Sequence, residues 1–130
     1  MVVDIDDLSH ALQKSWSKQT SSNPNEWSKD NPARGQCVPT ALVIQDYLGG
    51  DLVRYEVSTK RLKETHYANL TEDKSLIDLT ICQYQEPVKM IIKPVNLANF
   101  DSVRNKRLSD KSTKDRYLLL KKLVAKDLNK

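Results

Sequence analysis

The stretch 31-NPARGQCVPTALVIQDYLGG-50 decides the fold, because it changes from a loop to a helix at a cysteine. Pro32 and Gly35 are typical of a loop, and the apolar run after them is long enough for a buried helix. The pair Gly49–Gly50 ends that helix. Cys37 is therefore predicted to lie at, or next to, the first turn of the helix.

A cysteine in that place has a chemical use as well as a structural one. The N-terminus of a helix supplies unpaired N–H groups and the positive end of the helix dipole, and both stabilise a thiolate. The alternative is that Cys37 is a small buried hydrophobe, the common state of a lone cysteine in a helix. The chemical interpretation requires a base close to the thiol.

Of the two histidines, His10 lies near the polar face of a helix predicted over residues 4–17, whereas His66 lies in a strand predicted over 65–70. A polar turn and another strand, over 75–80, follow. If these strands pair about a turn centred on Glu72, His66 faces Asp78 with Cβ atoms about 4.5 to 5.5 Å apart. A two-residue shift leaves the pair diagonal, and a one-residue slip puts the two side chains on opposite faces.

Cys37, His66 and Asp78 are thus a candidate catalytic triad, with His66 as the base and Asp78 orienting its ring. The backbone N–H of Cys37 would hold the oxyanion, together with the side chain of Gln36 or the indole N–H of Trp27. The structural alternatives are a hydrogen-bonded histidine inside a strand and an aspartate that caps a turn.

The remaining pattern predicts strands over 51–57 and 87–95 and a helix over 112–128, which Ser112 and Asp115 would open as a capping box. The chain is the size of one domain, 1–130. The expected fold class is α+β. N-terminal helices pack on an antiparallel meander sheet, and a helix closes the chain.

Composition excludes several classes of protein. No apolar run reaches the roughly 20 residues that span a bilayer, and the acidic start does not resemble a secretory signal. A cytoplasmic protein without a membrane partner is expected. Cys37 and Cys82 lack CxxC spacing and the chain has only 2 histidines, so reduced thiols and neither metal nor cofactor are predicted. Cys82, with no basic neighbour in sequence, is predicted to be a core thiol.

The net charge of +4 is uneven, because residues 93–130 hold eleven Lys and Arg against four Asp and Glu. Charges of both signs are interspersed there, and only Phe100 and Tyr117 are aromatic, which disfavours a surface for stacking nucleic acid bases. A solvated helix face is the expected role of these charges, and nucleic acid is not an expected partner.

Five separated motifs resemble the YunG-like family of small bacterial proteins: Trp27, NPARGQC, TALVIQDYLGG, HYANL and IDLT, with an echo in RYLLL at 116–120. Ala68 and Pro39 depart from the family pattern, in which a Trp and an aliphatic residue are usual. The order of helix Cys, strand His and strand Asp is also similar to papain-like and transglutaminase-like enzymes. That second resemblance implies a papain/transglutaminase-like core with a helix across an antiparallel sheet.

Two functions from different classes follow from these residues. The first is a cysteine-dependent hydrolase or acyltransferase that acts on an amide or ester, with a protein or peptide among the candidate substrates. The second is a non-catalytic binding or regulatory module on the same fold, since a fold does not by itself establish a function.

Overall fold

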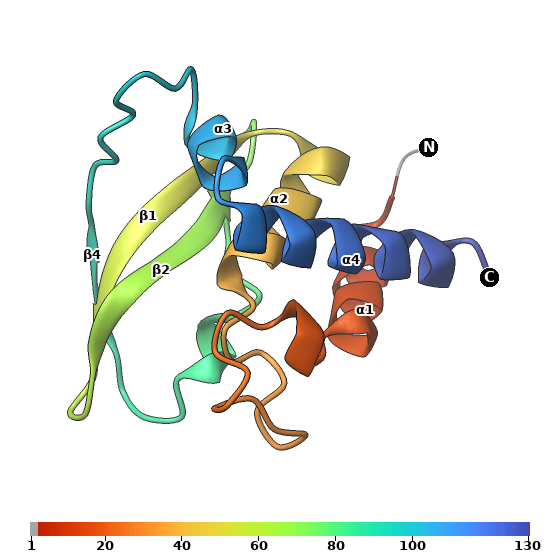
Figure 1. The fold of residues 1–130 in the computed structure, drawn as a ribbon, viewed down its shortest axis with the longest axis horizontal. Helices are drawn as coiled ribbons and strands as arrows, with labels where there is room; N and C mark the ends of the chain where they lie inside the picture. Colours follow the sequence, from red (N-terminus) through yellow and green to blue (C-terminus); the bar gives the residue numbers. More distant parts are fainter. Residues whose placement is uncertain (1–2) are drawn as a thin grey trace.

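The computed structural model describes residues 3–130, in which helices cover one face of an antiparallel sheet (Figure 1). The fold class is α+β, as predicted. The strands, in the spatial order β3-β2-β1-β4, are β1 (Asp51–Ser58), β2 (Lys63–Leu70), β3 (Leu76–Ile77) and β4 (Lys89–Ile92). The helices are α1 (Ile5–Ser15), α2 (Cys37–Leu48), α3 (Val103–Leu108), α4 (Lys111–Leu128) and the short 3-10 helices η1 (Lys18–Thr20) and η2 (Ile81–Gln83).

Strands β1, β2 and β3 form the predicted meander, but the fourth strand does not continue it. β4 pairs with β1 at the opposite edge of the sheet. Strand β3 has only two residues, which place Asn69 opposite Ile77 and Leu70 opposite Leu76. This register differs by two residues from the direct pairing of His66 with Asp78, so that pairing was wrong and the diagonal arrangement is found.

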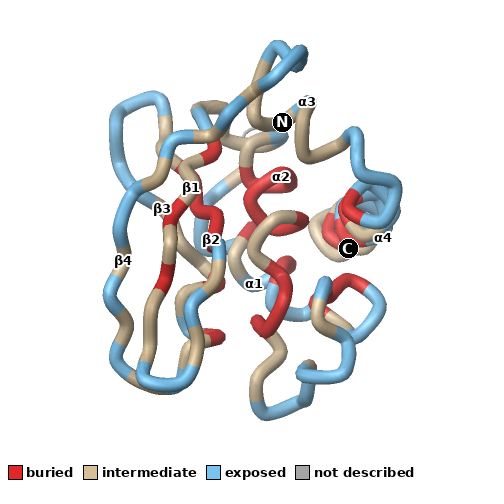
Figure 2. The backbone as a smooth tube through the Cα atoms, turned by 60° about the vertical axis from the view of Figure 1, so that its left-hand side comes forward, coloured by how far each residue is buried: buried red, intermediate tan, exposed pale blue. Residues whose placement is uncertain are grey.

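Helix α2 lies between the sheet and α4, and the middle of the helix is buried (Figure 2). Four consecutive apolar residues of α2, Ala41, Leu42, Val43 and Ile44, are each at most 2% exposed. A helix that is apolar on all sides belongs in a core. Side chains from both sides complete this core: Leu8 and Leu12 of α1, and Tyr117, Leu120 and Val124 of α4.

The loop before α2 is held by buried polar contacts that fix where the helix begins. Gln36 donates from Nε2 to the Ser17 carbonyl at 2.9 Å, and Thr20 donates from Oγ1 to Gln36 Oε1 at 2.8 Å. Gly35 has a φ of 78°, and a Cβ there would lie 2.2 Å from the oxygen of a serine side chain. The loop therefore needs glycine at this position.

The C-terminal part of the chain differs from the prediction at two points. Helix α4 begins after Asp110, whose carboxylate accepts a hydrogen bond from the Thr113 backbone N–H at 3.0 Å. The predicted capping box of Ser112 and Asp115 was therefore wrong. Helix α3 was not predicted at all, because its six residues are too few to show a helical period. No helix within residues 3–130 is both long and apolar enough to cross a membrane.

Candidate active site

His66 and Asp78 are in direct contact. The imidazole is completely buried, and its Nε2 donates to the two carboxylate oxygens of Asp78 at 2.9 and 2.8 Å. Asp78 follows the last residue of β3, and its side chain is 12% exposed. An aspartate bonded in this way fixes both the tautomer and the orientation of the ring.

Cys37 is half-buried at the first position of α2. Within the part of the chain that the structure describes, the backbone N–H groups of Cys37 and Val38 have no acceptor, as expected for a first helical turn. Burial by itself lowers the pKa of His66. The hydrogen bond to Asp78 and the neighbouring Cys37 sulfur outweigh burial and raise that pKa to about 9. His66 is therefore an imidazolium at neutral pH, between a carboxylate and a thiol.

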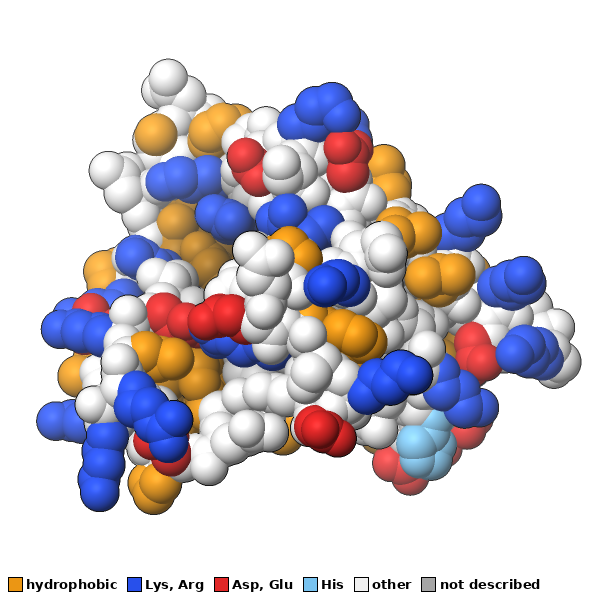
Figure 3. All heavy atoms as spheres, turned by 60° about the horizontal axis from the view of Figure 1, so that its bottom comes forward, with side chains coloured by type: hydrophobic (Ala, Val, Ile, Leu, Met, Phe, Trp, Pro, Cys, Tyr) orange, Lys and Arg blue, Asp and Glu red, His pale blue; other side chains and the backbone are white. Residues whose placement is uncertain are grey.

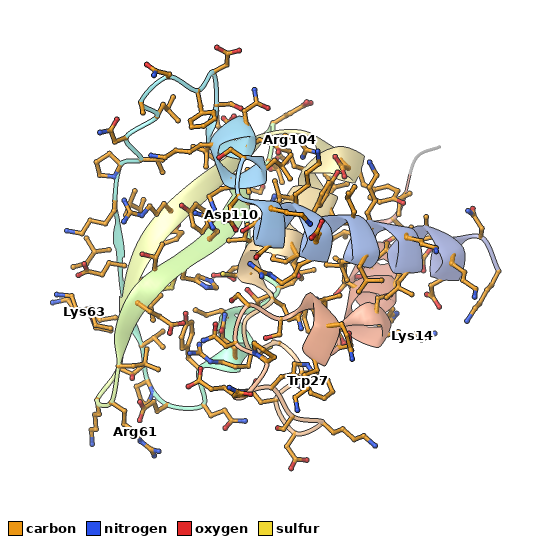
Figure 4. The ribbon with its side chains drawn as sticks, in the orientation of Figure 1. Lys14, Trp27, Arg61, Lys63, Arg104 and Asp110 are labelled. Carbon is orange, nitrogen blue, oxygen red and sulfur yellow. The ribbon has the colours of Figure 1, made fainter. Side chains whose placement is uncertain are left out.

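The amide of Gln36 and the indole N–H of Trp27 are hydrogen-bonded to the protein itself, which does not fit their expected role as oxyanion donors. Gln36 is completely buried between η1 and α2, where its amide bonds the Ser17 carbonyl and Thr20. The indole N–H of Trp27, which is labelled in Figure 4, donates to the Pro32 carbonyl of the same loop at 3.0 Å. Both side chains shape the loop that precedes α2.

Gln83, which no pattern in the sequence indicated, lies next to His66. Its Oε1 accepts hydrogen bonds from Arg34 Nη1 at 2.9 Å and from the Gly35 backbone N–H at 3.2 Å. These contacts turn its Nε2 towards the imidazole, 3.5 Å from His66 Nδ1. No periodicity could have revealed this position, because Gln83 ends the three-residue η2 helix.

Arg34 joins this glutamine to strand β2. The guanidinium bonds both carboxylate oxygens of Glu64, at 2.6 and 2.9 Å, and also bonds Glu26 at 2.9 Å. Burial raises the pKa of Glu64, and its hydrogen bonds to Arg34 and Tyr84 bring the pKa below its ordinary value. Because Glu64 and His66 are two residues apart on β2, the network ties the loop before Cys37 to the strand that carries the histidine.

Cys82 is exposed, so its prediction as a core thiol was wrong. Strand β3 ends at Ile77, and Cys82 lies in η2 rather than in the sheet. Both cysteines are free thiols. Within residues 3–130, no group of three or more His, Cys, Asp and Glu side chains is arranged to hold a metal ion.

A pocket of about 420 Å³ opens beside Cys37. Thr65 and Tyr67, which flank His66 on β2, contribute to its wall, and so do Val38 and Pro39 of α2. The thiol therefore has a cavity in front of it that can hold a small molecule or a side chain, since ligand sites usually enclose about 300 to 1,000 Å³.

Comparison with known proteins agrees with the family resemblance found in the sequence. An 85-residue stretch is 33% identical to the "Uncharacterized protein YunG" of Bacillus subtilis strain 168, and covers 65% of this chain and 67% of that protein. No solved structure matches the chain, so the papain/transglutaminase-like core stays a prediction. The "YunG protein" family matches residues 4–129. The chain therefore belongs to the YunG protein family.

Proposed function

We propose that the protein is a cysteine-dependent hydrolase or acyltransferase that acts on an amide or ester through Cys37, His66 and Asp78. The observation that carries the proposal is the buried His66, bonded to Asp78 through Nε2 and close enough to Cys37 for the sulfur to raise its pKa. The order of these residues along helix and strands resembles that in papain-like and transglutaminase-like enzymes.

The chemistry divides into acylation and deacylation. In acylation, the Cys37 thiolate adds to the substrate carbonyl carbon, and the C=O electron pair moves onto oxygen. The tetrahedral intermediate collapses to a thioester, and the departing amine or alcohol takes a proton from the His66 imidazolium. In deacylation, neutral His66 removes a proton from water or an acceptor amine, which adds to the thioester and expels the thiolate.

The oxyanion of the intermediate needs N–H donors that the substrate-free protein leaves unpaired. We assign this role to the backbone N–H of Cys37, which has no acceptor within residues 3–130. Gln83 takes the place that was expected for Gln36 or Trp27, because Arg34 and Gly35 hold its Oε1 and direct its Nε2 towards the reacting residues. Gln83→Ala should then slow acylation without preventing formation of the thiolate.

The test is the alkylation rate of Cys37 by iodoacetamide against pH, measured by mass spectrometry in a Cys82→Ser background. A thiol of ordinary pKa, about 8.5, is only about 1% thiolate at pH 6.5 and reacts slowly there. We expect Cys37 to react faster at pH 6.5 than such a thiol, and His66→Ala to abolish this advantage.

A slow reaction at pH 6.5 that is indifferent to His66→Ala would contradict the proposal. It would favour the non-catalytic binding or regulatory module, which has no use for a thiolate. If Cys37 reacts as expected, amide and ester substrates are tested next, and Cys37→Ala should abolish their turnover.

A further inference from the structure

Four basic side chains, and no acidic one, line the pocket beside Cys37. Arg54 comes from β1, Lys106 and Arg107 come from α3, and Arg116 comes from α4. On the face shown in Figure 3, Lys and Arg side chains lie among acidic ones. The basic residues of 93–130 are therefore not all a solvated helix face, since three of them converge on one cavity.

No ion pair neutralises these four cations within the described chain, residues 3–130. Arg54 and Lys106 donate to the backbone carbonyls of Pro94 and Asn96, which supply hydrogen bonds but no countercharge. The other two cations, Arg107 and Arg116, lie close to Thr113 and Asp110 near the start of α4.

Arg107 and Arg116 each reach Thr113 Oγ1 through Nη2, at 3.5 and 3.3 Å. The Nε atoms of both arginines are buried and have no hydrogen-bond partner within residues 3–130. Asp110 is the acid that they influence, but its carboxylate already accepts two hydrogen bonds from Thr113. The two guanidinium groups thus retain donors that protein atoms do not satisfy.

An anion in this pocket would relieve the mutual repulsion of the four cations. A guanidinium presents its N–H groups in a planar fork that matches a carboxylate or a phosphate. The N–H groups of Cys37 and Val38 at the start of α2 attract negative charge from the other side. The four cations and the two N–H groups therefore favour the same kind of ligand.

We infer that the substrate attacked by Cys37 is itself anionic: an amide or ester that carries a carboxylate or phosphate group, which Arg107 and Arg116 hold. This inference rests on the proposed function. The cavity of about 420 Å³ is large enough for such a group together with the carbonyl that Cys37 attacks.

Two alkylating reagents of nearly the same size test the inference, because iodoacetate carries a carboxylate where iodoacetamide carries a neutral amide. The rates of both are measured at Cys37 in the Cys82→Ser background, at pH 9 and one ionic strength, with glutathione as the reference thiol. We expect the iodoacetate-to-iodoacetamide ratio to exceed that of glutathione by about tenfold, because a cleft lined by one sign of charge concentrates the opposite ion.

Arg107→Gln and Arg116→Gln should each bring the ratio most of the way back to that of glutathione. Lys122→Gln is the matched control, because it removes one charge from an exposed position of α4 that does not line the pocket, and should leave the ratio unchanged. Arg54→Gln gives a second measure from the sheet side if a change in α3 or α4 disturbs folding.

Competing anions distinguish the two chemical sources. Pyrophosphate and malonate are compared as protectors of Cys37 against iodoacetamide, and preferential protection by one identifies a phosphate-bearing or a carboxylate-bearing substrate. A ratio equal to that of glutathione, unchanged by the arginine substitutions, would overturn the inference. It would leave the proposed function intact, which depends instead on fast, His66-dependent alkylation at pH 6.5. A slow reaction of Cys37 at pH 6.5 together with a high iodoacetate-to-iodoacetamide ratio would contradict the proposed function and would still show that the pocket attracts anions.

Discussion

At the scale of the residue, His66 owes its charge to its two neighbours. Burial disfavours an imidazolium, yet Asp78 and Cys37 raise the pKa of the ring to about 9. A raised pKa means that the proton is held at every pH below about 9 and is lost above it. In the proposed mechanism, the acid that protonates the leaving group is therefore available throughout the neutral range.

Replacing Asp78 with Asn should lower the pKa of His66 markedly, because it removes the carboxylate bonded to Nε2 at 2.8 and 2.9 Å. The measurement is an NMR titration of the histidine ring protons, in which the midpoint for His66 moves down from about 9. Cys37→Ala should move the same midpoint down through loss of the second neighbour. A midpoint that both variants leave unchanged would show that neither group sets the charge of the ring.

At the scale of the element, the pattern of the sequence predicted the parts of the chain with a clear period. The helix from Cys37, the strands over 51–57 and 65–70 and the last helix are all present, because apolar spacing reports burial directly. Strand β3 is shorter than the predicted 75–80, since the chain leaves the sheet at Asp78 to bond His66.

What the sequence could not predict depends on contacts between distant segments. The contact of His66 with Asp78 could be predicted, because the two strands of a hairpin restrict the possible partners, although the register differs by two residues from direct pairing. The following contacts could not. Gln83 is held by Arg34, almost fifty residues away in the chain, and no local pattern encodes that contact. The basic pocket likewise needs β1, α3 and α4 to be assembled before its charges converge.

The contact of Arg34 with Glu64 is what joins the loop before α2 to strand β2. Arg34→Leu should lower the free energy of unfolding by about 2 kcal/mol, because it leaves Glu64 partly buried without its cation. The pKa of Glu64 is lowered in the folded chain, so this loss is full above its ordinary value of 4.5 and shrinks as the pH falls.

Urea denaturation measures that loss, and Arg61→Leu is the control. Arg61 lies at the tip of the hairpin of β1 and β2 (Figure 4), and its side chain is 86% exposed where it pairs with Glu86. The control should change stability by less than about 0.5 kcal/mol, as exposed ion pairs usually do. Equal losses in the two variants would mean that the buried network contributes no more than a surface pair.

At the scale of the whole molecule, one hydrophobic cluster contains residues from α1, α2, β1, β2 and α4. A chain of this size whose helices and sheet share a main cluster usually unfolds in a single cooperative step. Hydrogen bonds also connect α2, α3 and α4, through Asp46, Arg104 and Tyr117. Arg104 donates to Asp46 Oδ1 at 2.7 Å and to the Tyr117 hydroxyl at 2.9 Å. These contacts hold α3 and α4, and hence Arg107 and Arg116, against α2.

Tyr117→Phe tests this connection with the loss of a single oxygen. The Tyr117 hydroxyl donates to Asp46 Oδ2 at 2.5 Å, so its removal leaves Asp46 and Arg104 each short of one hydrogen bond. We expect the free energy of unfolding to fall by about 1 to 2 kcal/mol in one cooperative urea transition. Tyr47→Phe is the control, since the Tyr47 hydroxyl has no hydrogen-bond partner within residues 3–130, and should change stability by less than about 0.5 kcal/mol. Two separate transitions for Tyr117→Phe would show instead that α3 and α4 unfold independently of the sheet.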